Sequence, residues 1–328
     1  MATLITGGTG LIGACLAEKL LGHGERVVLF DFAIAERRIA PLRTHGDRLQ
    51  VVQGDVQSVV AVFDVVRAHG VTSIVHLAYL LGHACNRSPE RATRVNILGT
   101  VNVLEAARLS GLERVLLASS IAVYGSDEEY APGERPLRED VPLRVASGLP
   151  IYGGGKLYLE HLARNYAEQY GLTVAGLRPS IVYGWGRESG SSAFTGEMID
   201  RAAVGQPARV EFGDARVSLV YVEDVAEQFQ ALLDADPRVL ARRRFFNTGG
   251  DTCTVRELVA VVQRLVPGAQ IEVASAGEAH IAGLAASVSD RSLETEIGYK
   301  RRFTPLEVGV RAQIDTGRAR AGLPPLAR

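Results

Sequence analysis

Tyr152 and Lys156, in the sequence Tyr-Gly-Gly-Gly-Lys, carry the most chemical information in this chain, where lysine occurs only at positions 19, 156 and 300. On a helix, residues four apart share a face, so the ammonium of Lys156 can lie near the phenol of Tyr152. A nearby positive charge favours phenolate, and we expect it to lower the tyrosine pKa from its usual value of about 10. Such a tyrosine could exchange a proton with an alcohol or a carbonyl. The alternative is a surface Tyr and Lys that share helical spacing by chance.

A glycine-rich turn near the N-terminus predicts a phosphate site. Residues 2–6 have the pattern of a buried strand, and Gly7-Gly8-Thr9-Gly10-Leu11-Ile12-Gly13 leads from it into an apolar helical pattern. Gly7, Gly10 and Gly13 allow a tight turn, a close backbone approach to a pyrophosphate and close helix packing. The first amides of the helix would then point at the phosphate.

The second predicted strand, residues 26–30, is followed by Asp31, about 20 residues beyond the glycines. A carboxylate there can accept hydrogen bonds from the adenosine ribose and repels a 2′-phosphate, which favours NAD over NADP. Arg37 and Arg38 follow closely and keep NADP open as an alternative.

Composition excludes several classes of protein. The 328 residues are 47% hydrophobic and 22% charged with a formal net charge of −1, so neither nucleic acid nor an anionic membrane is an expected partner. The three cysteines are far apart, which favours a reducing compartment, and neither they nor the seven histidines show metal-ligand spacing. A strand beginning at Ala2 leaves no room for a signal peptide, and no apolar run is long enough to span a bilayer. We expect a cytoplasmic protein.

The order of the remaining elements predicts an α/β fold with a parallel sheet. Further strands are expected at residues 49–53, 73–77, 114–119 and 172–177, and long helices at about 90–109 and 152–170. Those helices could form a subunit interface or pack only on the sheet. Regular alternation stops after Pro179, which predicts a smaller domain over the carboxyl ends of the strands. The tail from Thr316, rich in Arg, Pro and Gly, is expected to be loosely held.

A serine pair at the end of the strand at 114–119 could hold a substrate oxygen. Ser119 and Ser120 stand where a central strand of such a sheet meets the ligand crevice. No Gly-x-Ser-x-Gly elbow surrounds them, so neither is expected to be a hydrolase nucleophile. The alternative is a turn or helix cap, which serines form often.

Together these segments resemble the extended short-chain dehydrogenase/reductase family, specifically its NAD-dependent epimerase/dehydratase group. The resemblance extends over nearly the whole chain. Its motifs are Thr-Gly-Gly-Thr-Gly-Leu-Ile-Gly at 6–13, Gly-Asp-Val at 54–56, His-Leu-Ala at 76–78, Asn96, Ser-Ser-x-x-Val-Tyr-Gly at 119–125, Tyr-x-x-x-Lys at 152–156, Leu-Arg-Pro at 177–179 and Tyr-Val-Glu-Asp-Val-Ala at 221–226.

The resemblance implies a fold, a cofactor and a set of roles. The fold would be a Rossmann-type doubly wound parallel sheet, with an NAD-binding domain at 1–180, a substrate-binding domain at 181–328, and a return of the chain to the first domain near 217–250. Tyr152 would be the acid/base, Lys156 its electrostatic partner and ribose clamp, and Ser120 the ligand of the substrate oxygen. The residues expected at NAD are Gly7, Gly10, Leu11, Ile12, Gly13, Asp31, Asp55, Val56, Leu77, Ala78, Asn96, Ser119, Tyr152, Lys156 and Pro179.

The substrate is expected to meet the segments at 80–86 and 185–194. The residues predicted to contact it are Leu80, His83, Ser120, Tyr152, Ser180 and Arg187, and no metal site is expected. Asn96 has an alternative as an amide that packs helices, and His83 as a solvated loop residue.

Departures from the family pattern bear on the reaction. Dehydratases of the family have an Asp-Glu pair where this chain has Ile121 and Ala122, so a 4,6-dehydratase is not expected. Nucleotide-sugar members often have Asn at the position of Ile181 and Arg at that of Val217. Arg216 is one position away, and a shift of one residue turns a strand side chain to the opposite face. Gly155 stands where Ser is usual.

These departures favour a net NAD-dependent dehydrogenase acting on a sugar-like or other small hydroxy substrate, in a protein expected to be a homodimer. A UDP-sugar 4-epimerase with tightly held NAD uses the same half-reaction and is the alternative. A third interpretation is a non-catalytic dinucleotide-binding protein. This interpretation does not explain why Ser120, Tyr152 and Lys156 occur together.

Overall fold

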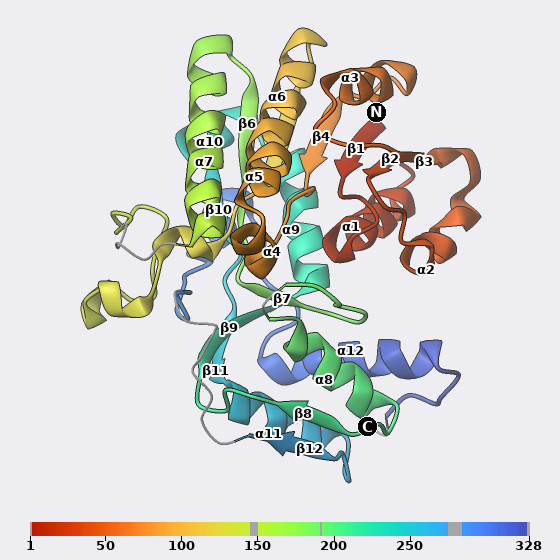
Figure 1. The fold of residues 1–328 in the computed structure, drawn as a ribbon, viewed down its shortest axis with the longest axis vertical. Helices are drawn as coiled ribbons and strands as arrows, with labels where there is room; N and C mark the ends of the chain where they lie inside the picture. The colour runs from red at the N-terminus through yellow and green to blue at the C-terminus, as the bar shows by residue number, and fades with distance from the viewer. Residues whose placement is uncertain (1, 145–149, 191, 275–283, 327–328) are drawn as a thin grey trace.

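A parallel sheet organises the larger part of the molecule (Figure 1), in a computed structural model that describes residues 2–144, 150–190, 192–274 and 284–326. Within these ranges the sheet has seven strands in the order β10-β6-β5-β4-β1-β2-β3. The strands are β1 (Ala2–Thr6), β2 (Arg26–Asp31), β3 (Leu49–Gln53), β4 (Ser73–His76), β5 (Arg114–Ala118), β6 (Thr173–Arg178) and β10 (Phe245–Asn247).

Successive residues of these strands face opposite sides of the sheet, and both sides are apolar. Ile5 and Leu29 belong to one buried cluster, while Leu4 and Val28 belong to the other. The first cluster is covered by α1 (Leu11–Gly22) and α9 (Val222–Asp234). The second is covered by α3 (Val59–Ala68), α6 (Gly99–Leu109) and α7 (Ile151–Tyr170). Helices on both faces of a parallel sheet confirm the predicted doubly wound α/β class.

Local sequence explains where several of these helices begin and end. Ser58 caps α3 by accepting a hydrogen bond from the Ala61 amide. α7 ends at Gly171, whose φ of 69° lies in the left-handed region that glycine adopts without strain. The short helices α2 (Glu36–Ile39), α4 (Gly82–Arg87), α5 (Pro89–Ala92) and α10 (Pro237–Arg242) and the π-helical segment Thr93–Leu98 complete this part.

The strand order reverses between β1 and β4, because the chain runs outward to β3 and then returns to the other side of β1. In open parallel sheets, ligands bind outside the carboxyl ends of the strands at such a switch point. The turns after β1, β4 and β5 therefore surround the expected ligand site.

A second group of elements lies against the carboxyl end of the large sheet (Figure 1). It contains a three-stranded sheet, β11-β9-β7, and a two-stranded parallel sheet, β12-β8. The strands are β7 (Ile181–Tyr183), β8 (Ala208–Val210), β9 (Arg216–Tyr221), β11 (Asp251–Thr254) and β12 (Ile271–Val273), and the helices are α8 (Ala193–Ala203), α11 (Val255–Leu265) and α12 (Leu306–Arg320).

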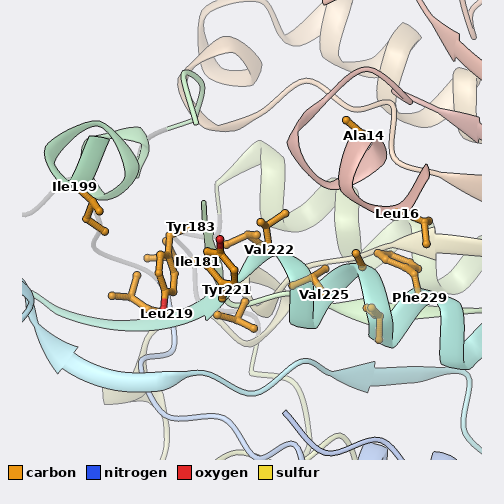
Figure 2. Close-up of a cluster of buried hydrophobic side chains, with 14 of the residues drawn as sticks. Ala14, Leu16, Ile181, Tyr183, Ile199, Leu219, Tyr221, Val222, Val225 and Phe229 are labelled. Atoms are coloured by element: carbon orange, nitrogen blue, oxygen red, sulfur yellow. The ribbon is translucent and has the colours of Figure 1, made fainter. Parts of the chain in front are cut away.

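The first buried cluster continues from the large sheet into this second group. Figure 2 shows it extending from Leu16 of α1 past Phe229 and Val225 of α9 to Leu219 and Ile199. Since α9 contributes to the cluster from one end to the other, the two parts share a core. The division of the chain at residue 180 stays a prediction, and β10 beside β6 supports a return of the chain to the large sheet.

The tail was predicted wrongly. α12 extends to Arg320, so Thr316 and Gly317 lie inside a helix. Gly317 is buried, and a Cβ atom there would lie 3.1 Å from the Trp185 ring. Packing of α12 against α8 and Trp185 therefore outweighs the loop-like composition of the tail.

Among the described helices, none is long and apolar enough to cross a membrane.

Candidate active site

A cavity of about 810 Å³ lies where the turns after β1, β4 and β5 meet the loop that follows β7. Its lining includes most of the predicted site residues, namely Gly7, Gly10, Leu11, Ile12, Gly13, Asp31, Asp55, Val56, Leu77, Ala78, Leu80, Ser119, Ser120, Tyr152, Lys156, Pro179, Ser180 and Arg187. Of the predicted residues, Asn96 is outside this lining, and the His83 side chain lies outside the described part of the structure.

The glycines form a tight backbone turn, the glycine cradle, in which side chains would collide with neighbouring backbone atoms. Gly7 has a φ of 64°, and a Cβ atom there would lie 2.8 Å from the Ala78 amide nitrogen. A Cβ atom at Gly13 would lie 2.7 Å from the carbonyl oxygens of Gly7 and Gly8. Both distances are shorter than any normal contact, so only glycine fits. The exposed backbone at the start of α1 is the kind of surface that receives a pyrophosphate.

Asp31 is fixed beside this cradle. The amide and hydroxyl of Thr9 donate to its Oδ2, at 3.0 and 2.8 Å. The carboxylate therefore stands at the cavity wall, and within the described residues Oδ1 remains for a ribose hydroxyl.

Arg37 and Arg38, which kept NADP open, face the loop after β7 instead of Asp31. Arg38 donates to the Gly186 carbonyl at 2.6 Å, and Arg37 pairs with Glu188. The guanidinium of Arg37 also lies 5.0 Å from the ring centroid of Trp185. These contacts connect the β2 turn to the loop after β7, and they support NAD over NADP.

Tyr152 and Lys156 lie one turn apart on α7, and both line the cavity. The Lys156 Nζ donates to the Ala118 carbonyl at 2.5 Å and lies 5.6 Å from the ring centroid of Tyr152. The same Nζ lies 3.3 Å from the ring centroid of Tyr79. The rings of Tyr79 and Tyr152 meet edge to face, with centroids 5.7 Å apart and planes at 89°.

The prediction that Tyr152 is acidified is wrong for this site. Burial raises the pKa of Tyr152 to about 12, although a hydrogen bond from Ser120 and the charge of Arg187 both oppose that rise. Burial also lowers the pKa of Lys156 to about 7, against the opposing effects of Cys85 and Glu160. Burial disfavours both the Tyr152 phenolate and the Lys156 ammonium. For Tyr152 this effect outweighs the stabilisation of the phenolate that its spacing from Lys156 predicts.

The two serines after β5 have different contacts. The Ser120 Oγ accepts from the Ala122 amide at 3.1 Å, so it caps a turn, and Ser120 lines the cavity together with Tyr152. The Ser119 hydroxyl donates to Glu160 at 2.6 Å, and Glu160 forms a buried salt bridge with Arg178 at 2.7 Å. Because the Ser119 hydroxyl is bonded to Glu160, only the backbone of Ser119 is available for the predicted contact with NAD.

Asn96 holds the loop after β4 and does not reach the cavity. Its Oδ1 accepts from the Leu80 amide at 2.7 Å, and its Nδ2 donates to the Leu80 carbonyl at 3.2 Å. The Asn96 side chain is buried and its amide fixes the backbone of Leu80. Asn96 therefore positions the loop after β4, and its place outside the lining does not support the predicted contact with NAD.

Tyr79 was missed by the sequence analysis. It directly follows Leu77 and Ala78 at the carboxyl end of β4, so its position at the switch point was the available signal. A Cβ atom on Gly155 would lie 2.6 Å from the Tyr79 hydroxyl. The glycine that replaces the usual Ser in the Tyr-x-x-x-Lys segment thus makes room for this phenol.

The positions that differ from the nucleotide-sugar pattern are apolar and enclosed. Ile181 and Val217 are buried, and Ile181 lines the cavity. Arg216 is exposed on β9, pairs with Thr254 in the strand register, and lies outside the lining. Arg216 therefore does not replace the missing arginine. Among the described residues, no cluster of three His, Cys, Asp or Glu side chains could hold a metal ion.

The pattern that defines the NAD dependent epimerase/dehydratase family matches residues 3–247. The chain belongs to this family. Among curated relatives, this family member is 29% identical to UDP-glucuronate 4-epimerase 1 of Arabidopsis thaliana, over 95% of this chain and 75% of that protein. It is 30% identical to the UDP-glucose 4-epimerase of Mycolicibacterium smegmatis, over 79% of this chain and 80% of that protein.

Solved structures of two kinds of enzyme resemble this family member. The UDP-glucose 4-epimerase of Thermus thermophilus, in complex with NAD, superposes with a TM-score of 0.83 and 26% identity over 97% of this chain and 99% of that one. The GalE-like L-threonine dehydrogenase of Cupriavidus necator superposes with a TM-score of 0.82 and 25% identity over 96% and 99%.

The epimerase/dehydratase family member is an NAD-dependent enzyme, and its cavity fits the cofactor. The glycine-rich turn would hold the pyrophosphate with its backbone, and Asp31 would accept hydrogen bonds from the adenosine ribose. When bound, NAD supplies a nicotinamide ring that accepts or returns a hydride. The same lining contains Ser120, Tyr152 and Lys156, the residues predicted to handle the proton.

Proposed function

We propose that this enzyme oxidises a secondary alcohol of a small hydroxy substrate, with net transfer of a hydride to NAD. One observation carries the proposal: Ser120, Tyr152 and Lys156 share a single cavity with the glycine-rich turn. The apolar Ile181 and Val217 favour a net dehydrogenase over a nucleotide-sugar enzyme, since a buried diphosphate requires polar partners.

In this mechanism Ser120 holds the substrate oxygen and Tyr152 exchanges the proton with it. A phenol with a pKa of about 12 is protonated at neutral pH, so it is ready to donate to a carbonyl oxygen and must lose its proton before it accepts one from an alcohol. The Lys156 amine lies over the ring of Tyr79, and Lys156 also lines the cavity. Oxidation should therefore accelerate as pH rises, and reduction should slow.

A UDP-sugar 4-epimerase is the second candidate. The relatives from Arabidopsis thaliana and Mycolicibacterium smegmatis carry names of this kind. The similarity in structure to a threonine dehydrogenase supports the net dehydrogenase instead. Both reactions begin with the same removal of a hydride and a proton, and they differ in whether the hydride returns to the substrate.

One screen separates these reactions. The purified enzyme with added NAD is incubated with sugars, polyols, hydroxy acids and UDP-sugars, while NADH absorbance and epimer formation are followed together. Accumulating NADH supports the dehydrogenase. Interconversion of UDP-sugars without net NADH overturns it in favour of the epimerase. Firmly bound NAD with neither outcome would indicate a non-catalytic protein.

We also infer a homodimer that works in the cytoplasm. The adjacent helices α6 and α7 and the π-helical segment before α6 expose five large apolar side chains, Leu98, Leu109, Ile151, Tyr158 and Tyr170. A second copy of the same surface would cover them. Light scattering should report a dimer that Tyr158→Glu converts to monomer, and a monomeric wild type would contradict it. The free thiols of Cys15, Cys85 and Cys253 support a reducing compartment.

A further inference from the structure

Arg187 differs from the other enclosed arginines in its partners. Arg178 pairs with Glu160 at 2.7 Å, and Arg301 pairs with Asp290 at 2.7 Å. Arg114 instead donates to backbone carbonyl groups at the end of α9. Within the described residues, Arg187 has neither kind of partner for its charge. Its Nη2 donates to the neutral Ser192 hydroxyl at 2.8 Å, and its Nε is buried without a hydrogen-bond partner.

The stem of Arg187 is packed so that the guanidinium stays at the cavity. A Cβ atom on Gly196 of α8 would lie 2.8 Å from the Arg187 Cβ, so the helix backbone touches the stem directly. The neighbouring Gly186 is fixed twice, because its amide donates to Asp200 at 2.7 Å and its carbonyl accepts from Arg38 at 2.6 Å. The fork is therefore preorganised, which reduces the entropy lost when it binds a ligand.

The charge of Arg187 is incompletely balanced in the cavity. Burial lowers its pKa to about 10, and the only described charge that opposes this fall is that of Tyr152, which is neutral at pH 7. The guanidinium is thus charged at neutral pH without an anion. An enclosed charge without a counter-charge is costly, so the site favours an anionic ligand.

Position and charge together indicate which anion fits. Arg187 and Tyr152 line the same cavity and influence each other's charge, so an anion at Arg187 lies close to the reacting carbinol. The planar fork matches the two oxygens of a carboxylate. A diphosphate has more oxygen atoms than one guanidinium can contact, and Ile181 offers it no polar contact.

We propose that Arg187 binds a carboxylate of the substrate, next to the carbinol that Ser120 and Tyr152 receive. The proposal deepens the proposed function and rests on it. The substrate is then a hydroxy acid, in which one carbon chain carries both the oxidised alcohol and the anion. Neutral polyols and sugars without a carboxylate would lack the contact with Arg187.

Binding of malonate to the NAD-loaded enzyme tests this site without requiring turnover. Malonate presents carboxylates and has no alcohol to oxidise. We expect calorimetry to show binding to the wild type that weakens about 10- to 100-fold in Arg187→Gln, since a hydrogen bond to a charged group is lost. Arg187→Lys should bind with intermediate affinity, because it keeps the charge and loses the fork. Arg209→Gln is the matched control, since Arg209 is an exposed arginine outside the cavity.

The outcomes separate this inference from the proposed function. Equal binding of malonate to wild type and Arg187→Gln, or none to the wild type, overturns the carboxylate site. Binding of UDP or inorganic phosphate through Arg187, without malonate, overturns it in favour of a phosphate. If NADH forms from neutral alcohols and malonate does not bind, the proposed function stands and this inference fails. If malonate binds through Arg187 and no alcohol yields NADH, Arg187 is a carboxylate site but the proposed function fails, and with it the assignment of that carboxylate to an oxidised substrate.

Discussion

Lys156 is held against the face of Tyr79, with its Nζ 3.3 Å from the ring centroid. On its other side the amine donates to the Ala118 carbonyl at 2.5 Å. One contact from the loop after β4 and one from the end of β5 therefore fix the lysine. The ring face of Tyr79, more than its hydroxyl, makes the contact, since that hydroxyl has no hydrogen-bond partner in the described residues.

Replacing Tyr79 should separate the role of the ring from that of the hydroxyl. Tyr79→Leu removes a cation–π contact worth about 1–2 kcal/mol, and we expect kcat to fall roughly tenfold as Lys156 loses its fixed position. Tyr79→Phe keeps the ring and should stay within about twofold of the wild type. Steady-state kinetics on both variants, with the Kd for NAD as a control, decide the matter. Equal losses in the two variants would assign the role to the hydroxyl.

Gly155 and its neighbour Gly154 should respond in opposite directions to alanine. The Cβ atom of Gly155→Ala would meet the Tyr79 hydroxyl at 2.6 Å, so we expect a loss of about 1–3 kcal/mol in the free energy of unfolding. Nothing lies within 4 Å of a Cβ atom at Gly154, so Gly154→Ala should gain about 1 kcal/mol from helix propensity. Urea denaturation measures both.

A double variant checks the cause of that loss. In a Tyr79→Phe background the nearest ring atom lies 3.9 Å from the Cβ atom at position 155, which is an ordinary contact. Gly155→Ala should then be tolerated. A loss that persists in this background would place the strain elsewhere.

Lys156 should give the cofactor-free protein a distinctive pH dependence. Burial lowers its folded pKa to about 7, while in the unfolded chain it titrates near 10.4. Between those values the unfolded state binds more protons, so the free energy of unfolding rises with pH by roughly 1 kcal/mol per pH unit. Relative to Lys156→Met, the wild type should gain stability from pH 7 to pH 10. Parallel pH profiles for the two proteins would refute the lowered pKa.

Local patterns in the sequence were sufficient to predict the sheet and the cofactor cradle. Each strand expected in the first 180 residues is present, with ends shifted by one residue at most, because alternation of apolar residues and glycine turns is a local signal. The same holds for Tyr152 and Lys156, whose spacing along one helix fixes their neighbourhood. The fold class therefore followed from short segments read one at a time.

Contacts between distant segments were beyond such an analysis. The space that Gly155 leaves for Tyr79 depends on two residues far apart in the chain. The direction of the Tyr152 pKa depends on how deeply the cavity encloses the phenol, which spacing alone does not specify. The helix at the C-terminus was missed because Gly317 packs against Trp185, a partner that composition does not reveal.

The most direct test of proton transfer by Tyr152 is the rate of NADH formation in Tyr152→Phe, measured alongside the Kd for NAD. We predict that turnover falls by about 10²- to 10⁴-fold, as expected when a general acid/base is removed. Affinity for NAD should stay within about threefold, because the glycine cradle and Asp31 are untouched and one hydrogen bond sets the scale of any change. Turnover at the wild-type rate, or loss of NAD binding together with activity, would contradict the assignment.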